Sequence, residues 1–298
     1  MLSIVRRGEH RYDIFENDRD IGSVSVSRSP LHDRHCQLHL ELERYDPEIA
    51  GELFRLLRRE LGMPLKVMAC TTRSLHAFLT AGGFARKRRC WELEVSAKDL
   101  ISPLCAALPL TTARRGSRLY DACCALLYVH YRTTHAAVSP LTATLDEFRS
   151  HLPDTILCTP DDHPRHCAFL EEDELAYTAT ADPNTFPAFA QSLLHELFRR
   201  YETITTECDD CDECAMTVKA LFRTKDDGSW DTDLYAPRKA ASPRPQSRGH
   251  FLLSGFIYWP PQGSAAILAP RSNAFCRSFG KPVSWRACLA SGSNMVQL

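Results

Sequence analysis

The spacing of apolar residues between positions 174 and 222 predicts a strand, a helix, a second strand and a second helix. Residues 175–180 form a β-branched and aromatic run that ends at the turn signal Asp182-Pro183-Asn184. Apolar side chains then recur at three- and four-residue spacing, which is typical of one helical face: Phe186, Phe189, Leu193, Leu194, Leu197 and Phe198. Residues 201–206 are a second strand candidate, and Asp212 lies in an acidic cluster well placed to cap the next helix.

The same order of elements occurs earlier in the chain. Residues 36–43 alternate polar and apolar side chains as a strand, Asp46-Pro47 opens a helix, and residues 65–70 form a second strand. Thr72 then caps a short helix that stops at Gly82, and residues 84–95 return as a strand. A strand–helix–strand unit of this length implies a parallel pair with a right-handed crossover. Two copies of one unit indicate a tandem fold.

These segments resemble a known family. Residues 74–84, followed by 89–95, are similar to the last helix, the Gly-Phe turn and the final strands of the GNAT acyltransferase superfamily, and the hairpin around Asn17-Asp18 also fits. The resemblance covers residues 11–95 and about 120–235. It implies a mixed α/β, GNAT-like fold with two three-layer units, each a central mixed sheet flanked by helices. We expect units at residues 1–96 and 97–236 and an irregular C-terminal tail at 237–298.

The resemblance also implies acetyl-CoA as a co-substrate. The family binds the pyrophosphate of coenzyme A with backbone N–H groups at a helix N-terminus. The matching positions in the second unit are Thr185, Ala188 and Ala190. In the first unit Glu48 puts a negative charge at the matching position, so we expect no coenzyme A there. The helix tyrosine that reprotonates the leaving thiolate in the family is replaced by Leu79 and Thr217, and neither can act as that acid.

Candidate catalytic and substrate-binding residues lie near the predicted acceptor site. Resemblance to the family puts one wall of that site at the first two helices and their loop, a region that here holds Tyr131 and Thr134 as candidate substrate-binding residues. His130 and His135 are candidate general bases, and Glu207 could orient a water or bind an ammonium. A histidine at a helix end is also commonly a cap or a surface residue, and Glu207 could belong to a solvated acidic turn.

Charge and apolar content exclude several classes of function. The 298-residue chain has a formal net charge of −1 with both signs interspersed, which argues against a nucleic-acid surface. The basic run at residues 86–89 is interpreted as a solvated strand edge. No apolar stretch reaches the length of a membrane helix, and residues 1–7 are too short and charged for a signal peptide, so we expect a cytoplasmic protein without a membrane partner.

The chain contains 13 cysteines, three of which have metal-ligand spacing. Cys208, Cys211 and Cys214 could surround zinc or an iron–sulfur cluster. However, no fourth ligand follows at a standard interval, and all four intervening residues are acidic. His130 and His135 are five residues apart, which turns them away from each other on a helix. We therefore expect no metal, and keep a cysteine metal centre as a weaker alternative.

The composition of the chain changes near its C-terminal end. Residues 230–235 are expected to complete the fold, and no Asp or Glu follows Asp233. The tail is interpreted as lying outside folding selection, with a basic segment that binds an acidic partner as the alternative.

The predicted function is an N-acyltransferase that moves an acetyl group from acetyl-CoA to a small-molecule or peptide amine in the second unit. The alternative is a non-catalytic binding or sensor module, and the oligomeric state is left open.

Overall fold

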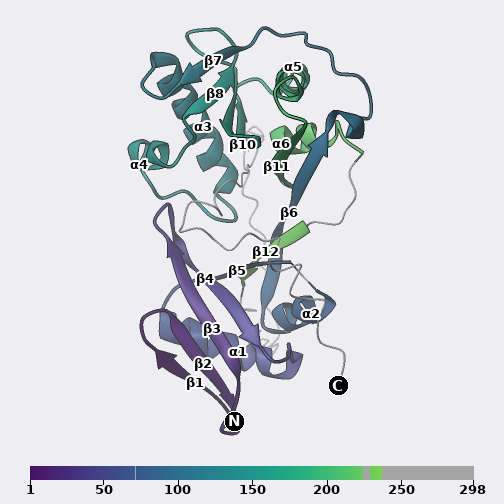
Figure 1. Cartoon of the computed structure of the whole chain (residues 1–298). Coiled ribbons are helices and arrows are strands. Elements are labelled where there is room, and N and C mark those ends of the chain that lie inside the picture. Colours follow the sequence, from purple (N-terminus) through teal and green to yellow (C-terminus); the bar gives the residue numbers. More distant parts are fainter. Residues whose placement is uncertain (71, 224–228, 237–298) are drawn as a thin grey trace, which may run out of the picture.

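The computed structural model describes residues 1–70, 72–223 and 229–236 (Figure 1). The strands of its first part are β1 (Leu2–Arg7), β2 (Arg11–Glu16), β3 (Arg19–Ser29), β4 (His32–Leu42), β5 (Leu65–Ala69) and β6 (Phe84–Ser96). Its first helices are α1 (Pro47–Leu61) and α2 (Arg73–Ala81), and the short 3-10 helix η1 (Ala97–Asp99) follows β6. The later strands are β7 (Thr111–Arg114), β8 (Thr155–Cys158), β9 (His166–Glu171), β10 (Glu174–Thr180), β11 (Thr203–Asp209) and β12 (Ser229–Tyr235). The later helices are α3 (Arg118–His135), α4 (Leu145–Ser150), α5 (Phe186–Phe198) and α6 (Glu213–Lys219).

All twelve described strands form one continuous sheet. Its order is β1-β2-β3-β4-β5-β12-β6-β11-β10-β9-β8-β7. The late strand β12 lies between β5 and β6, antiparallel to both, and the second half of β6 pairs with β11. Figure 1 shows two lobes, the first built on β1 to β5 with α1 and α2, and the second on β7 to β11 with α3 to α6. The strands β6 and β12 run between them. Each lobe therefore uses a strand that the other half of the sequence supplies, and the sheet crosses the boundary predicted at residue 96.

Side-chain alternation along the strands distributes the core. In the first lobe, α1 and α2 pack with β1 to β5 into a single apolar cluster that includes Phe54 and Phe78. In the second lobe, Leu157 and Ala168 pack with α5 and α6, whereas their neighbours Ile156 and Phe169 pack with α3. Because successive residues of a strand point to opposite faces, α3 covers one face of this half of the sheet and α5 and α6 cover the other.

The predicted elements are largely confirmed. The pairs β4/β5 and β10/β11 are parallel, and the side chains of Asp46, Thr72 and Asp212 each accept a backbone hydrogen bond as helix N-caps. The Ser139-Pro140 pair predicts a helix start, but α4 begins after Thr144, where a capping box with Glu147 satisfies two backbone N–H groups.

Two further expectations concern membrane-spanning helices and the C-terminal residues 237–298. No described helix is long and apolar enough to cross a membrane. The interpretation of residues 237–298 as an irregular tail falls outside the described residues.

Gly22 on β3 provides a test of the first lobe. It has φ of 127°, and a Cβ atom there would overlap the carbonyl oxygen of Glu41 on β4. Strained backbone alone costs about 1–3 kcal/mol, so we expect Gly22→Ala to lower the free energy of unfolding by at least about 2 kcal/mol. Gly51→Ala is the matched control: its nearest neighbour would be 3.9 Å away, and on helix α1 alanine should stabilise by about 0.5–1 kcal/mol. Urea unfolding measures both, and equal stability of the two variants would contradict the overlap.

Candidate active site

The parallel strands β10 and β11 diverge shortly after they meet. They pair only at Glu174 with Thr205 and at Leu175 with Thr206. Beyond this point the register of β10 against β9 shifts between Leu175 and Tyr177, which leaves Ala176 as a bulged residue. A bulge bends its strand and removes the bulged residue from the ladder. The result is a gap between β10 and β11.

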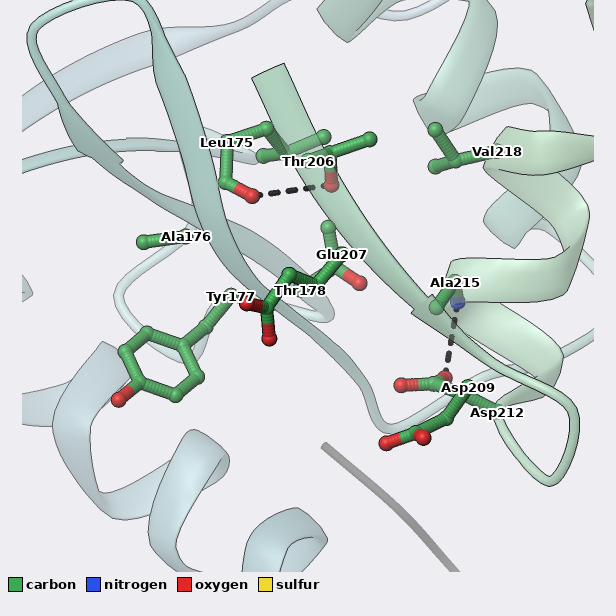
Figure 2. A pocket seen from close by; sticks show the side chains of 10 residues that line it. All are labelled: Leu175, Ala176, Tyr177, Thr178, Thr206, Glu207, Asp209, Asp212, Ala215 and Val218. Atoms are coloured by element: carbon green, nitrogen blue, oxygen red, sulfur yellow. Dashed lines mark hydrogen bonds between the residues drawn. The ribbon is translucent and has the colours of Figure 1, made fainter. Parts of the chain in front are cut away.

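Side chains from β10, β11 and α6 line this gap (Figure 2). The lining residues are Leu175, Ala176, Tyr177, Thr178, Thr206, Glu207, Asp209, Asp212, Ala215 and Val218. At its narrow end the hydroxyl of Thr206 donates to the carbonyl oxygen of Leu175 at 3.0 Å. The cavity volume is about 20 Å³, which is enough for about one water molecule. A larger ligand can enter only if the strands separate further.

Glu207 is the predicted catalytic residue that the structure places in this gap. Figure 2 shows it on β11 between β10 and the start of α6, while the ring of Tyr177 points out of the gap. The Oε2 atom of Glu207 is buried and has no hydrogen-bond partner among the described residues. Burial, and then the nearby charge of Asp209, raise the pKa of Glu207 from 4.5 to about 8. A carboxyl group with such a pKa can take or give a proton near neutral pH.

A buried ion pair closes one side of the site, and the sequence did not predict it. Arg88 on β6 donates to Asp209 at 3.1 Å, and both residues are at least 95% buried. The Arg88 guanidinium also donates to the hydroxyl of Thr232 on β12 and stacks 5.0 Å from the ring centre of Trp230. The interpretation of residues 86–89 as a solvated strand edge is therefore wrong at Arg88, because β6 lies between β12 and β11 inside the sheet.

The four candidate residues at the end of α3 do not line the gap. The hydroxyl of Tyr131 bonds to Nε2 of His32 at 3.0 Å, and the ring of His135 stacks on that of Tyr131 with centres 3.8 Å apart. Thr134 donates its hydroxyl to carbonyl oxygens of its own helix. His130 instead lies next to the turn between β11 and α6. These side chains belong to the helix itself and not to a loop, and the structure brings none of them to Glu207.

The candidate coenzyme A positions lie at the N-terminus of α5. Thr185 is the N-cap residue, and its hydroxyl bonds to Asp182 at 2.7 Å and to His166 at 2.9 Å. Ala188 is half-buried in the first turn, while Ala190 is fully buried in the core. The first backbone N–H groups of a helix have no partner within the helix, so this end can accept an anion. Asp182 opposes anion binding here, because its negative charge lies beside the first turn of α5.

The cysteine spacing does not form a common site. Cys208 is buried in the core against α5 and α6, and in the described part of the chain the three sulfur atoms do not converge. A metal centre made of Cys208, Cys211 and Cys214 together is therefore excluded for the fold as described. Cys214 instead lies near His130, a pairing that sequence spacing could not reveal.

A second, more open hollow lies beside β7. Arg114 and Arg200 border it together with Leu119 and small or hydroxyl-bearing side chains, and no carboxylate, histidine or cysteine is among its lining residues. It therefore offers no general acid or base. The gap between β10 and β11 is the better candidate for an active site.

Comparison with known proteins identifies the class of fold. A GCN5-related N-acetyltransferase from Sphaerobacter thermophilus aligns with a TM-score of 0.51 and 9% identity, over 77% of this chain and 81% of that chain. A tandem GNAT protein from the clavulanic acid biosynthesis pathway aligns with a TM-score of 0.44 and 11% identity, over 75% of this chain and 81% of that chain. N-myristoyltransferase from Saccharomyces cerevisiae aligns with a TM-score of 0.42 and 11% identity, over 77% of this chain and 68% of that chain. No protein-family profile and no curated protein sequence matches the chain.

The chain is thus a mixed α/β protein in which a parallel strand pair opens beside a bulge. Its fold is that of the GNAT N-acetyltransferases, as the sequence resemblance implied.

Proposed function

We propose that the chain is an acyltransferase that moves an acetyl group from acetyl-CoA to an amine at the gap between β10 and β11. The observation that carries this proposal is the position of Glu207. Its carboxyl group lies in the gap opposite the bulge at Ala176, on a fold shared with N-acetyltransferases. His130 and His135 have no part in the proposed chemistry, because neither lines the gap.

The proposed reaction is direct transfer. The backbone N–H of the bulged Ala176 is released from the strand ladder and polarises the thioester carbonyl. The amine nitrogen attacks the carbonyl carbon, the carbon–sulfur bond breaks, and coenzyme A leaves as the thiolate. Glu207 takes the proton that the amine nitrogen loses. No tyrosine acid is needed for this scheme, because a thiolate is a fair leaving group.

The charges around Glu207 favour a cationic acceptor. Asp209, Glu174 and Glu92 contribute negative potential at its carboxyl group against the positive charge of Arg88, and Glu92 is exposed to solvent. Acidic groups around a cleft raise the local concentration of a positively charged substrate. We therefore propose as the acceptor a small-molecule or peptide amine that is cationic in solution. It loses one proton to solvent before the neutral nitrogen attacks, and the second proton goes to Glu207.

A binding module without catalysis is the second candidate. The cavity holds about one water molecule, and Asp182 lies where the pyrophosphate of coenzyme A would approach α5. Both observations count against acetyl-CoA at this site and so favour the non-catalytic alternative. The two candidates differ in whether acetyl-CoA binds at α5.

Thermal unfolding of the full chain with acetyl-CoA tests the proposal. A ligand at about 100 times its dissociation constant stabilises the native state by about 2.7 kcal/mol, so the melting midpoint should rise. Ala188→Glu should abolish the rise, because a carboxylate in the first turn of α5 repels the pyrophosphate. Ala137→Glu, at an exposed alanine after α3, is the matched control and should keep it. No shift at millimolar acetyl-CoA would leave the binding module as the remaining candidate.

A further inference from the structure

Three side chains of metal-ligand type meet between α3 and the start of α6. His130 comes from the second-last turn of α3, Asp212 is the N-cap of α6, and Cys214 lies in the first turn of α6. One ligand atom of each residue lies within 4.8 Å of the other two. More than 80 residues of sequence separate His130 from the other two, so only the fold brings them together.

The surrounding structure holds these side chains in place. The Oδ1 atom of Asp212 accepts the backbone N–H of Ala215 at 2.9 Å, which orients the carboxylate. Asp212 and Cys214 are at least 96% buried, and His130 is half-buried.

We propose that His130, Asp212 and Cys214 bind Zn²⁺. Thiolate, imidazole and carboxylate are the three ligand types that zinc accepts in proteins, at about 2.3, 2.0 and 2.1 Å respectively. Such bond lengths place tetrahedral ligand atoms about 3–4 Å apart, so the group needs only a small contraction. Calcium and magnesium prefer oxygen ligands, and an iron–sulfur cluster needs more cysteines than converge here. Three protein ligands leave one coordination position for a water molecule.

The ion would fasten α3 to the turn between β11 and α6. That turn follows directly on the strand that carries Glu207, and Asp212 lines the same gap. The zinc site is nevertheless independent of acyl transfer, because its ligands would link two elements whether or not the gap binds acetyl-CoA. Its test therefore uses metal binding and stability, and not activity.

Metal analysis of the purified full chain is the first experiment. We expect about one zinc per chain, a lower melting midpoint after removal by a chelator, and recovery on adding Zn²⁺ alone. Replacement by Co²⁺ should give the absorption of a tetrahedral ion with a thiolate-to-metal charge-transfer band. No bound zinc, together with no change in the melting midpoint on adding zinc, would overturn the proposal.

Variants then assign the ligands. Cys214→Ser and His130→Gln should each weaken zinc binding more than about 100-fold, since loss of even an outer-shell partner costs 10–100-fold. Cys211→Ser, at another thiol of the spacing motif, and His163→Gln, at an exposed loop histidine, should leave binding unchanged. If Cys214→Ser does not fold, the half-buried His130→Gln decides. Equal losses in Cys211→Ser and Cys214→Ser with normal binding by His130→Gln would overturn the assignment in favour of a cysteine site.

Discussion

Asp209→Ala is expected to lower the free energy of unfolding by about 3–5 kcal/mol. Its carboxylate pairs with the guanidinium of Arg88 at 3.1 Å in the interior, where both side chains are almost fully buried. Taking a charge out of water costs several kcal/mol, and the partner charge offsets that cost only while it is present. Alanine removes the offset and keeps the buried guanidinium between β6, β11 and β12, which would weaken the junction of the two lobes.

The paired replacement separates the charge effect from packing. Arg88→Met with Asp209→Leu removes both charges, so we expect it to recover most of the stability lost in Asp209→Ala. Arg149→Ala breaks two surface pairs, with Asp121 and Asp146, whose side chains are 53% and 81% exposed, and should cost only about 1 kcal/mol. Urea unfolding of the four proteins measures these differences. A loss in Asp209→Ala no larger than that in Arg149→Ala would show that the buried pair does not hold the sheet together.

Local elements of the fold are predictable from the sequence because their signals are local. Helix α1 begins at an Asp-Pro pair, and α2 and α6 begin at Thr72 and Asp212, which cap them as expected. The position of β12 is not predictable in this way. Its partners on β5 lie more than 160 residues earlier in the chain. The alternation of side chains along a strand does not indicate which other strands it will pair with.

The difference between local and long-range signals also explains which parts of the candidate site the sequence could predict. The sequence points to Glu207 because it lies at the end of a predicted strand, and the structure places it in the gap, while its catalytic role stays a prediction. Arg88 appears in a basic run, and charged runs are usually solvated, so only the position of β6 inside the sheet reveals that it is buried. The relation of His130 to Cys214 also depends on tertiary contacts, whereas the spacing of the three cysteines suggested a site that the fold does not form.

Glu207→Gln is expected to lower kcat/KM for acyl transfer by about 10²–10⁴-fold, which is the usual contribution of a general base. The wild-type kcat/KM, calculated for the neutral form of the amine, should rise with pH and level off above about pH 8, because burial and the charges of Asp209, Glu174 and Glu92 raise the pKa of Glu207 to about 8 against the opposing charge of Arg88. In the glutamine variant this rise should disappear. An initial-rate assay with acetyl-CoA and a cationic amine, across pH 6–9, measures both effects.

Stability measured on the same variant distinguishes a catalytic role from a structural one. Between pH 4.5 and 8 the folded chain keeps the proton of Glu207 while the unfolded chain releases it, so the folded state binds more protons and the free energy of unfolding falls as pH rises. Glutamine cannot ionise, so this decline should become shallower and the variant should be the more stable protein above pH 8. A residue that only supports the fold would lose activity and stability together. Lower activity with higher stability at alkaline pH would therefore identify a carboxylate kept in an unfavourable environment for its chemistry, whereas a variant that is less stable at every pH would contradict that role.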